Sequence, residues 1–167
     1  MSGPRWRPAY IGLGSNLDEP VAQVRAGLGA LGGIDKTLPV LESGLYRSAP
    51  LGPKDQPDFI NAVAAVLTRL EPFVLLAALQ ALEDTHGRNR DVDRWGPRTL
   101  DLDLLSYSAE TIDVDELTLP HPGIADRNFV LLPWREIAPR YHVPGLESVA
   151  ALAARVSMSE PRIERIE

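Results

Sequence analysis

The sequence predicts an α+β fold, a ferredoxin-like sandwich in which helices pack on a mainly antiparallel sheet. Strand-like and helix-like stretches follow one another in the order strand, helix, strand, strand, helix, strand, which is the order of the split βαβ unit. Short polar returns separate some of the strands, and such returns favour this class over a doubly wound parallel sheet. The length of 167 residues, 44% of them hydrophobic, predicts one domain with a sizeable core.

The first strand is expected at residues 9–13, after a loose lead-in at residues 1–8 that holds two prolines and two arginines. A helix follows, because Val21, Val24 and Leu28 recur at helical spacing. Asp18 is the expected N-cap of this helix and Pro20 suits its first turn.

The middle of the chain predicts a strand at residues 40–46, a loop at residues 48–57 and a strand at residues 59–67. The loop holds three prolines and can be neither a helix nor a central strand. In the strand, Phe59 and Asn61 share one face, and the opposite face, which begins with Ile60, is the expected core face. The next helix opens at Pro72 and has a leucine stripe from residue 75 to residue 82.

Residues 84–97 are polar and predict a mobile loop, which is followed by a strand at residues 99–107. Residues 111–114 predict a return strand, and residues 117–119 are a further short apolar run. A short helix broken by Pro133 is expected at residues 127–134, and a last helix at residues 146–156. The tail, residues 157–167, is charged and carries no structural signal.

Two aspartates stand out in the strand after the polar loop. Asp101 and Asp103 alternate with leucines, so both carboxylates point to the same face. A divalent metal is the simplest reason for two like charges at this distance, since Mg²⁺ is held by one or two carboxylates together with phosphate oxygens. Four arginines precede the pair, at positions 88, 90, 94 and 98, and metal-binding carboxylates with guanidinium groups equip a protein for phosphoryl transfer. An amphipathic edge strand with two solvated aspartates explains the same pattern equally well.

Composition excludes several classes of protein. The formal net charge of −6 argues against general nucleic-acid binding. The absence of cysteine excludes disulfides and thiolate zinc sites. There is no signal peptide and no apolar run of membrane-spanning length, which predicts a cytoplasmic protein.

The motifs of several enzyme classes are also absent. The P-loop, the protein-kinase motifs, the His-Glu-x-x-His zinc helix and the Gly-x-Ser-x-Gly nucleophile elbow are all absent. Gly12-Leu13-Gly14 lacks the third glycine of a dinucleotide fingerprint, because Leu17 occupies its place. An Asp-x-Asp pair also occurs in metal-dependent glycosyltransferases, although those enzymes generally need a larger nucleotide-binding domain.

Five segments together identify a family. Arg-Trp-Gly-Pro-Arg-Thr-Leu-Asp-Leu-Asp at residues 94–103 and Leu-Gly-Pro-Lys-Asp-Gln-Pro-Asp-Phe-Ile-Asn at residues 51–61 are the most specific. They occur in order with Gly-Ser-Asn-Leu at 14–17, Tyr-Arg-Ser at 46–48 and Pro-His-Pro at 120–122. Across roughly residues 9–145 the chain closely resembles 6-hydroxymethyl-7,8-dihydropterin pyrophosphokinase of folate biosynthesis. The resemblance implies a single pyrophosphokinase domain that transfers the terminal diphosphate of ATP to the pterin hydroxymethyl group and releases AMP.

The resemblance also implies roles for individual residues on the nucleotide side. Asp101 and Asp103 match the carboxylates that hold two Mg²⁺ ions, and Arg88 and Arg98 match catalytic-loop arginines that bind the triphosphate. Further ATP contacts are implied at Gln80, Glu83, Trp95, Leu104, Thr118, His121 and Arg127.

On the pterin side, Phe59 and Phe129 match a pair of rings that stack on the flat heterocycle, and Asn61 matches the amide that reads its edge. Further substrate contacts are implied at Ser48, Ala49, Leu51, Trp95 and Asp101. Trp95 would close over the pterin as ATP draws Arg88 and Arg98 inward, so we expect a lid whose opening or product release limits turnover.

Two positions depart from the family pattern. Ser48-Ala49-Pro50 stands where many members have Thr-Pro-Pro, which leaves that loop somewhat freer, and Pro122 follows His121 where some members have Tyr. Neither change removes a metal ligand or a stacking ring.

No strong general base is evident, so we expect the rate to come from alignment and charge compensation. The expected partners are ATP and the reduced pterin, with neither nucleic acid nor membrane, and the expected state is a monomer. Another metal-dependent nucleotide enzyme and a binding module without chemistry are the competing interpretations.

Overall fold

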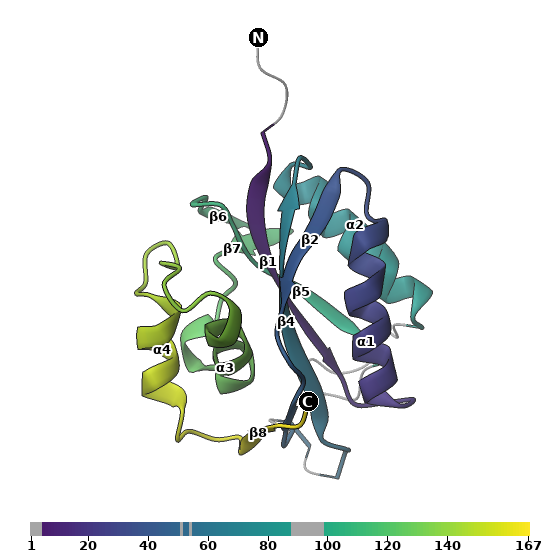
Figure 1. Ribbon diagram of the computed structural model, residues 1–167, viewed down its shortest axis with the longest axis vertical. Helices are drawn as coiled ribbons and strands as arrows, with labels where there is room; N and C mark the ends of the chain where they lie inside the picture. Colours follow the sequence, from purple (N-terminus) through teal and green to yellow (C-terminus); the bar gives the residue numbers. More distant parts are fainter. Residues whose placement is uncertain (1–4, 51, 54, 88–98) are drawn as a thin grey trace.

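The computed structural model describes residues 5–50, 52–53, 55–87 and 99–167. Figure 1 shows a twisted sheet with helices on both sides. In chain order the elements are β1 (Arg7–Ser15), α1 (Pro20–Ala30), β2 (Thr37–Glu42), β3 (Tyr46–Ser48), β4 (Phe59–Thr68), α2 (Pro72–Thr85), β5 (Asp101–Tyr107), β6 (Ile112–Val114), β7 (Leu117–Leu119), α3 (Asn128–Ile137), α4 (Val149–Val156) and β8 (Ile163–Arg165), with short 3₁₀ turns at Leu31–Gly33 and Ile124–Asp126.

The main sheet has the strand order β5-β1-β4-β3-β8, and β2 also pairs with β4. Every pairing is antiparallel. Because β2 and β3 follow one another along the same edge of β4, the central order is that of a ferredoxin-like sheet. The predicted α+β class, with an antiparallel sheet and packed helices, is confirmed. β6 and β7 form a separate hairpin.

Two apolar cores cover the two faces of the sheet. One core packs Val24 of α1 and Leu75 and Leu79 of α2 against β1, β4 and β5. The other packs Leu131 and Trp134 of α3, together with α4, against the opposite face. Each face of β4 is therefore buried, and not only the face of Ile60 that the sequence marked as core. None of the helices in the described part of the chain is long and apolar enough to cross a membrane.

Two local expectations in the first half of the chain were wrong. The strand expected at residues 40–46 is two strands, because the chain leaves the ladder between Glu42 and Tyr46, where the Ser43 hydroxyl accepts a hydrogen bond from the Val63 amide at 2.9 Å. Asp18 is not the N-cap of α1, since Glu19 occupies that position in a left-handed conformation without a side-chain cap.

In the second half of the chain, the structure differs from the sequence-based expectations at α3 and in the tail. α3 continues through Pro133 to Ile137 instead of breaking there. Proline removes one hydrogen bond and disfavours a helix interior by about 3 kcal/mol, but Leu131 and Trp134 are fully buried on the second core, and this packing holds the helix. The tail, which carried no signal, contains strand β8.

Candidate active site

Two rows of residues run across the strands β4, β1 and β5. Asn61, Gly14 and Asp101 are paired in one row, and Val63, Gly12 and Asp103 in the next. Paired residues in a sheet point to the same face, so both aspartates share a face with Asn61. Adjacent strands are about 4.8 Å apart, which places the Asn61 and Asp101 backbones about 10 Å apart. Gly14 carries no side chain and is partly exposed, so the surface between the Asn61 amide and the Asp101 carboxylate is left uncovered there, whereas Gly12 is buried beneath the Leu105 side chain.

Strand β5 presents the aspartates because it is the edge of the sheet and its first four residues alternate between aspartate and leucine. Leu102 and Leu104 are buried in the first core, whereas Asp101 and Asp103 are only partly buried. On the outer side of β5, the buried Glu83 carboxylate of α2 accepts a hydrogen bond from the Leu102 amide at 2.8 Å. This bond fastens the C-terminal half of α2 to the strand and gives a partner to a backbone group at the sheet edge.

A cavity of about 310 Å³ opens beside β5, between α2 and the β6–β7 hairpin. Most of the predicted nucleotide and metal residues that the structure describes line it, namely Gln80, Glu83, Asp101, Asp103, Leu104, Thr118 and His121. The wall is completed by Leu76, Leu102, Leu117 and Pro122, together with Asp115 and Glu116 of the hairpin turn. These last two acids carry no signal in the sequence, since they resemble an ordinary solvated turn between two strands.

The predicted residue Arg127 is not part of this cavity lining. It precedes α3, and its guanidinium group lies over Gly123, where an added Cβ would come within 3.2 Å of Arg127 Nε. Leu51, Arg88, Trp95 and Arg98 lie outside the described residues, as does most of the predicted lid.

The predicted pterin residues lie around Asn61, on the β4 side of Gly14, opposite the aspartates of β5. Asn61 Nδ2 donates a hydrogen bond of 2.7 Å to the Ser48 hydroxyl of β3, and both side chains are buried. Phe59 is paired with Ser48 and lies on the same strand face as Asn61 and Val63. Val63 belongs to the second core, against which Phe129 of α3 also packs. Phe59 and Phe129 are therefore on the same side of the sheet.

Asn16 is a further residue of this region to which the sequence assigned no role. It follows β1 and is almost fully buried. Its Nδ2 donates hydrogen bonds of 3.0 Å to Gln56 Oε1 and 3.0 Å to the Pro57 carbonyl. Asn16 thus ties the end of the proline-rich loop to the strand that carries the glycines. The Gly-Ser-Asn-Leu segment was the available signal, although a buried amide cannot be told from a turn residue in the sequence.

The chemistry of the donor set fits Mg²⁺ with a bound polyphosphate. In the described part of the chain no group of three or more histidine, cysteine or acidic side chains could hold a metal. Asp101 and Asp103 form a pair on one strand face, and Mg²⁺ is commonly held by one or two carboxylates with the remaining positions filled by water and phosphate. These two residues therefore suit a metal that arrives with its nucleotide.

Comparison with known proteins decides the family. Residues 10–139 match the family described as 7,8-dihydro-6-hydroxymethylpterin-pyrophosphokinase (HPPK). The chain belongs to this family. It is 47% identical over 144 residues to the 2-amino-4-hydroxy-6-hydroxymethyldihydropteridine pyrophosphokinase of Haemophilus influenzae, which covers 86% of this chain and 89% of that protein. It is 50% identical over 135 residues to the enzyme of the same name from Pseudomonas aeruginosa, which covers 81% of this chain and 83% of that protein.

Solved structures agree on the fold. A crystal structure of Plasmodium falciparum HPPK-DHPS with pteroate superimposes with a TM-score of 0.71 at 13% identity, covering 95% of this chain and 44% of that one. This chain thus spans less than half the length of that protein. The resemblance seen in the sequence is confirmed, and so is the activity that it implied, the transfer of diphosphate from ATP to hydroxymethyldihydropterin in folate biosynthesis.

Proposed function

We propose that this pyrophosphokinase reaction takes place along the row Asn61, Gly14, Asp101, with the pterin at the Asn61 end and the ATP phosphates at the Asp101 end. The single observation that supports this arrangement is the register of β4, β1 and β5, which puts an amide, an open glycine and a carboxylate side by side on one face. The spacing suits a flat heterocycle lying over the glycine, with its hydroxymethyl group directed towards the acidic pair.

On the pterin side, Asn61 reads the heterocycle edge and Ser48 fixes the orientation of the amide. The Ser48 hydroxyl accepts one Nδ2 hydrogen of Asn61 at 2.7 Å, which leaves the other hydrogen and the carbonyl oxygen of that amide for the ligand. Phe59 and Phe129 stack on the two faces of the ring, which is a favourable arrangement for a conjugated system. Ala49, Leu51 and Trp95 complete this side.

On the phosphate side, Asp101 and Asp103 would hold two Mg²⁺ ions. When bound, these ions screen the charge of the triphosphate and favour loss of the proton from the pterin hydroxyl. Glu83 acts on the strand, because its carboxylate holds the Leu102 amide between the two aspartates. Gln80, Leu104, Thr118 and His121 bind the nucleotide, and Arg127 reaches it from the start of α3. Arg88 and Arg98 neutralise the charge that develops on the phosphate oxygens.

In this arrangement the pterin oxygen attacks the β-phosphorus of ATP, the bond from that phosphorus to the α-phosphate oxygen breaks, and AMP leaves. The chain contributes binding and orientation rather than a basic side chain. We further propose that residues 1–167 act as one pyrophosphokinase domain, as a monomer in the cytoplasm. The lack of cysteine is consistent with a reducing compartment.

One assay tests the function. The protein is incubated with ATP, Mg²⁺ and 6-hydroxymethyl-7,8-dihydropterin, and the nucleotide products are separated. AMP in equal amount to the pterin diphosphate is expected. ADP as the nucleotide product would indicate ordinary kinase chemistry, AMP with free pyrophosphate would indicate a hydrolase, and unchanged ATP would indicate a binding module.

A further inference from the structure

The tail of the chain, residues 157–167, lies along the seam between α3 and β3. In Figure 1 it runs from α4 below α3 to the sheet. Its strand β8 is antiparallel to β3, with Ile163 opposite Ser48 and Arg165 opposite Tyr46. Just beyond β3, the Ala49 amide donates a hydrogen bond of 3.1 Å to the Arg162 carbonyl. The strand that carries Ser48 is therefore held on one side by β4 and on the other by the tail.

The helix α3 holds the same tail near both of its own ends. At its start, the fully buried Asn128 donates from Nδ2 to the Ser159 carbonyl at 3.0 Å and to the Pro161 carbonyl at 2.7 Å. Near its end, Glu136 accepts from Arg165 Nε at 3.1 Å. Asn128 is the direct neighbour of Phe129, so the tail is attached where the predicted stacking ring begins.

Glu136 also joins the helix to β3 without the tail. Its carboxylate accepts hydrogen bonds from the Tyr46 hydroxyl at 2.9 Å and from the Gly44 amide at 2.8 Å. The carboxylate is thus a junction of helix, strand and tail. This junction lies at the Tyr46 end of β3, whereas the Ser48 end is tied to α3 through the tail and Asn128.

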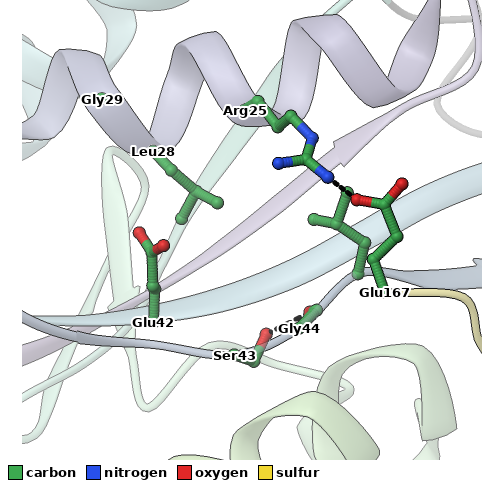
Figure 2. Close-up of a pocket in the computed structure, with 8 residues that line it drawn as sticks. Arg25, Leu28, Gly29, Glu42, Ser43, Gly44 and Glu167 are labelled. Carbon is green, nitrogen blue, oxygen red and sulfur yellow. Dashed lines mark hydrogen bonds and ion pairs between the residues drawn. The ribbon is translucent and has the colours of Figure 1, made fainter.

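Glu167 lies next to Gly44. The Leu45 amide donates to the Glu167 carbonyl at 3.3 Å, and Ile166 donates back to Leu45 at 2.8 Å. An added Cβ at Gly44 would collide with the Glu167 carbonyl oxygen, so only glycine permits this position of Glu167. Figure 2 shows the Glu167 side chain in an ion pair with Arg25 of α1, beside a cavity of about 470 Å³. Glu167 is therefore held by both the Leu45 backbone and α1.

We propose that residues 159–167 are a brace that sets the distance between the two walls of the pterin site, with Ser48 and Ala49 on one wall and Phe129 on the other. This inference rests on the proposed pterin site. A strand of three residues at a sheet edge is weakly held by one neighbour, and α3 packs mainly on β4 rather than on β3. The tail bonds to both walls. It is a positioning element that touches neither the reacting phosphorus nor the pterin oxygen.

The test compares two substitutions at one position. Glu164 lies opposite Arg47 in the β3–β8 pairing, and its side chain is exposed. Glu164→Pro removes a backbone N–H and disrupts this short strand, whereas Glu164→Ala keeps the backbone. Both variants lose the exposed ion pair with Arg47, so their difference reports the strand pairing alone. Arg165→Met is a milder variant that removes the tail side of the Glu136 contact.

Steady-state kinetics with varied pterin and varied ATP give the readout. For Glu164→Pro we expect KM for the pterin to rise about tenfold, with kcat and KM for ATP within about twofold of the parent protein. Glu164→Ala should match the parent, and Arg165→Met should raise the pterin KM about two- to threefold. A wild-type pterin KM in Glu164→Pro would refute the brace proposal. A variant in which kcat falls while KM rises for both the pterin and ATP would refute it as well.

The controls separate this proposal from the one on which it rests. If the parent protein forms no AMP, the proposed function is wrong. If it forms AMP and the Pro and Ala variants at 164 have the same pterin KM, only the brace is wrong. Should Glu164→Pro fail to fold by circular dichroism, Arg165→Met decides, and an unchanged pterin KM in that variant would overturn the brace.

Discussion

The two ends of the proposed row are built in opposite ways. At the Asp101 end, two carboxylates stand on an edge strand beside an open cavity and are partly exposed. At the Asn61 end, the amide and the Ser48 hydroxyl are 5% and 2% exposed and hydrogen bonded to each other. The acidic end must accept a hydrated ion and a phosphate chain, whereas the amide end is arranged before the ligand arrives. We therefore expect changes at the first end to act on kcat and changes at the second to act on pterin affinity.

The largest effect is expected at the acidic end. Asp101→Asn and Asp103→Asn keep the size of the side chain but remove the charge that a metal needs, and should each lower kcat by roughly 10³-fold or more. Thermal unfolding should be little changed, because both side chains are only partly buried. The measurement is the rate of AMP formation. Asp35→Asn, at an exposed position before β2 that is not part of the cavity lining, is the matched control and should be fully active. Near-full activity in either site variant would refute the metal assignment.

The acidic end was the part of the site that residues alone could suggest. Alternation of leucine and aspartate in the segment 99–105 is a local property, and it correctly predicts that Leu102 and Leu104 are more buried than Asp101 and Asp103. It does not predict the rest of β5, which is buried on both faces. The local pattern did not distinguish a metal pair from a solvated edge, since that depends on α2 and the β6–β7 hairpin folding over the strand. The same holds for Asp115 and Glu116, which the hairpin brings to the cavity.

The amide end could not be derived from local pattern. Asn61 lies between Ile60 and Ala62 in a strand that is buried on both faces, and only the pairing with β3 explains how a polar group is accommodated there. Its role came from the family resemblance instead. The tail is the extreme case, because its bonds to Asn128, Ala49 and Leu45 join segments far apart in the chain and leave no periodic signal.

Substitutions at the amide end should weaken the binding of the pterin. Asn61→Leu keeps the branched shape of the side chain but cannot hydrogen bond, and it leaves the buried Ser48 hydroxyl without this partner. An unmade buried hydrogen bond costs about 1–3 kcal/mol, so we expect KM for the pterin to rise roughly 10- to 100-fold. KM for ATP should stay near that of the parent protein. Ser48→Ala should give a smaller rise, because it loosens the amide without removing it. Equal losses for ATP and pterin would contradict the separation of the two ends.

The glycine between the ends offers a sharper test of where the ring lies. A Cβ at Gly14 would be 3.5 Å from Asn61 Oδ1, an ordinary contact, so Gly14→Ala should fold normally. The added methyl group would occupy the surface that the pterin is proposed to cover, and the pterin KM should rise about tenfold. Gly29→Ala in α1, where nothing lies within 4 Å, is the matched control. An unchanged pterin KM in Gly14→Ala would move the ring off this row.

The smallest effect concerns the junction at Glu136 and its dependence on pH. Burial, followed by the hydrogen bond to Glu136, raises the pKa of Tyr46 to about 12 from 10.0. Above pH 10 the unfolded chain therefore releases a proton that the folded protein keeps, and the free energy of unfolding falls as the pH rises towards 12. Tyr46→Phe should remove this part of the decline. In urea unfolding, the stability advantage of the parent over Tyr46→Phe should be constant up to about pH 9 and shrink between pH 10 and 12. A constant difference across that range would mean that the hydroxyl titrates alike in both states, and Glu136 would then not hold the strand through Tyr46.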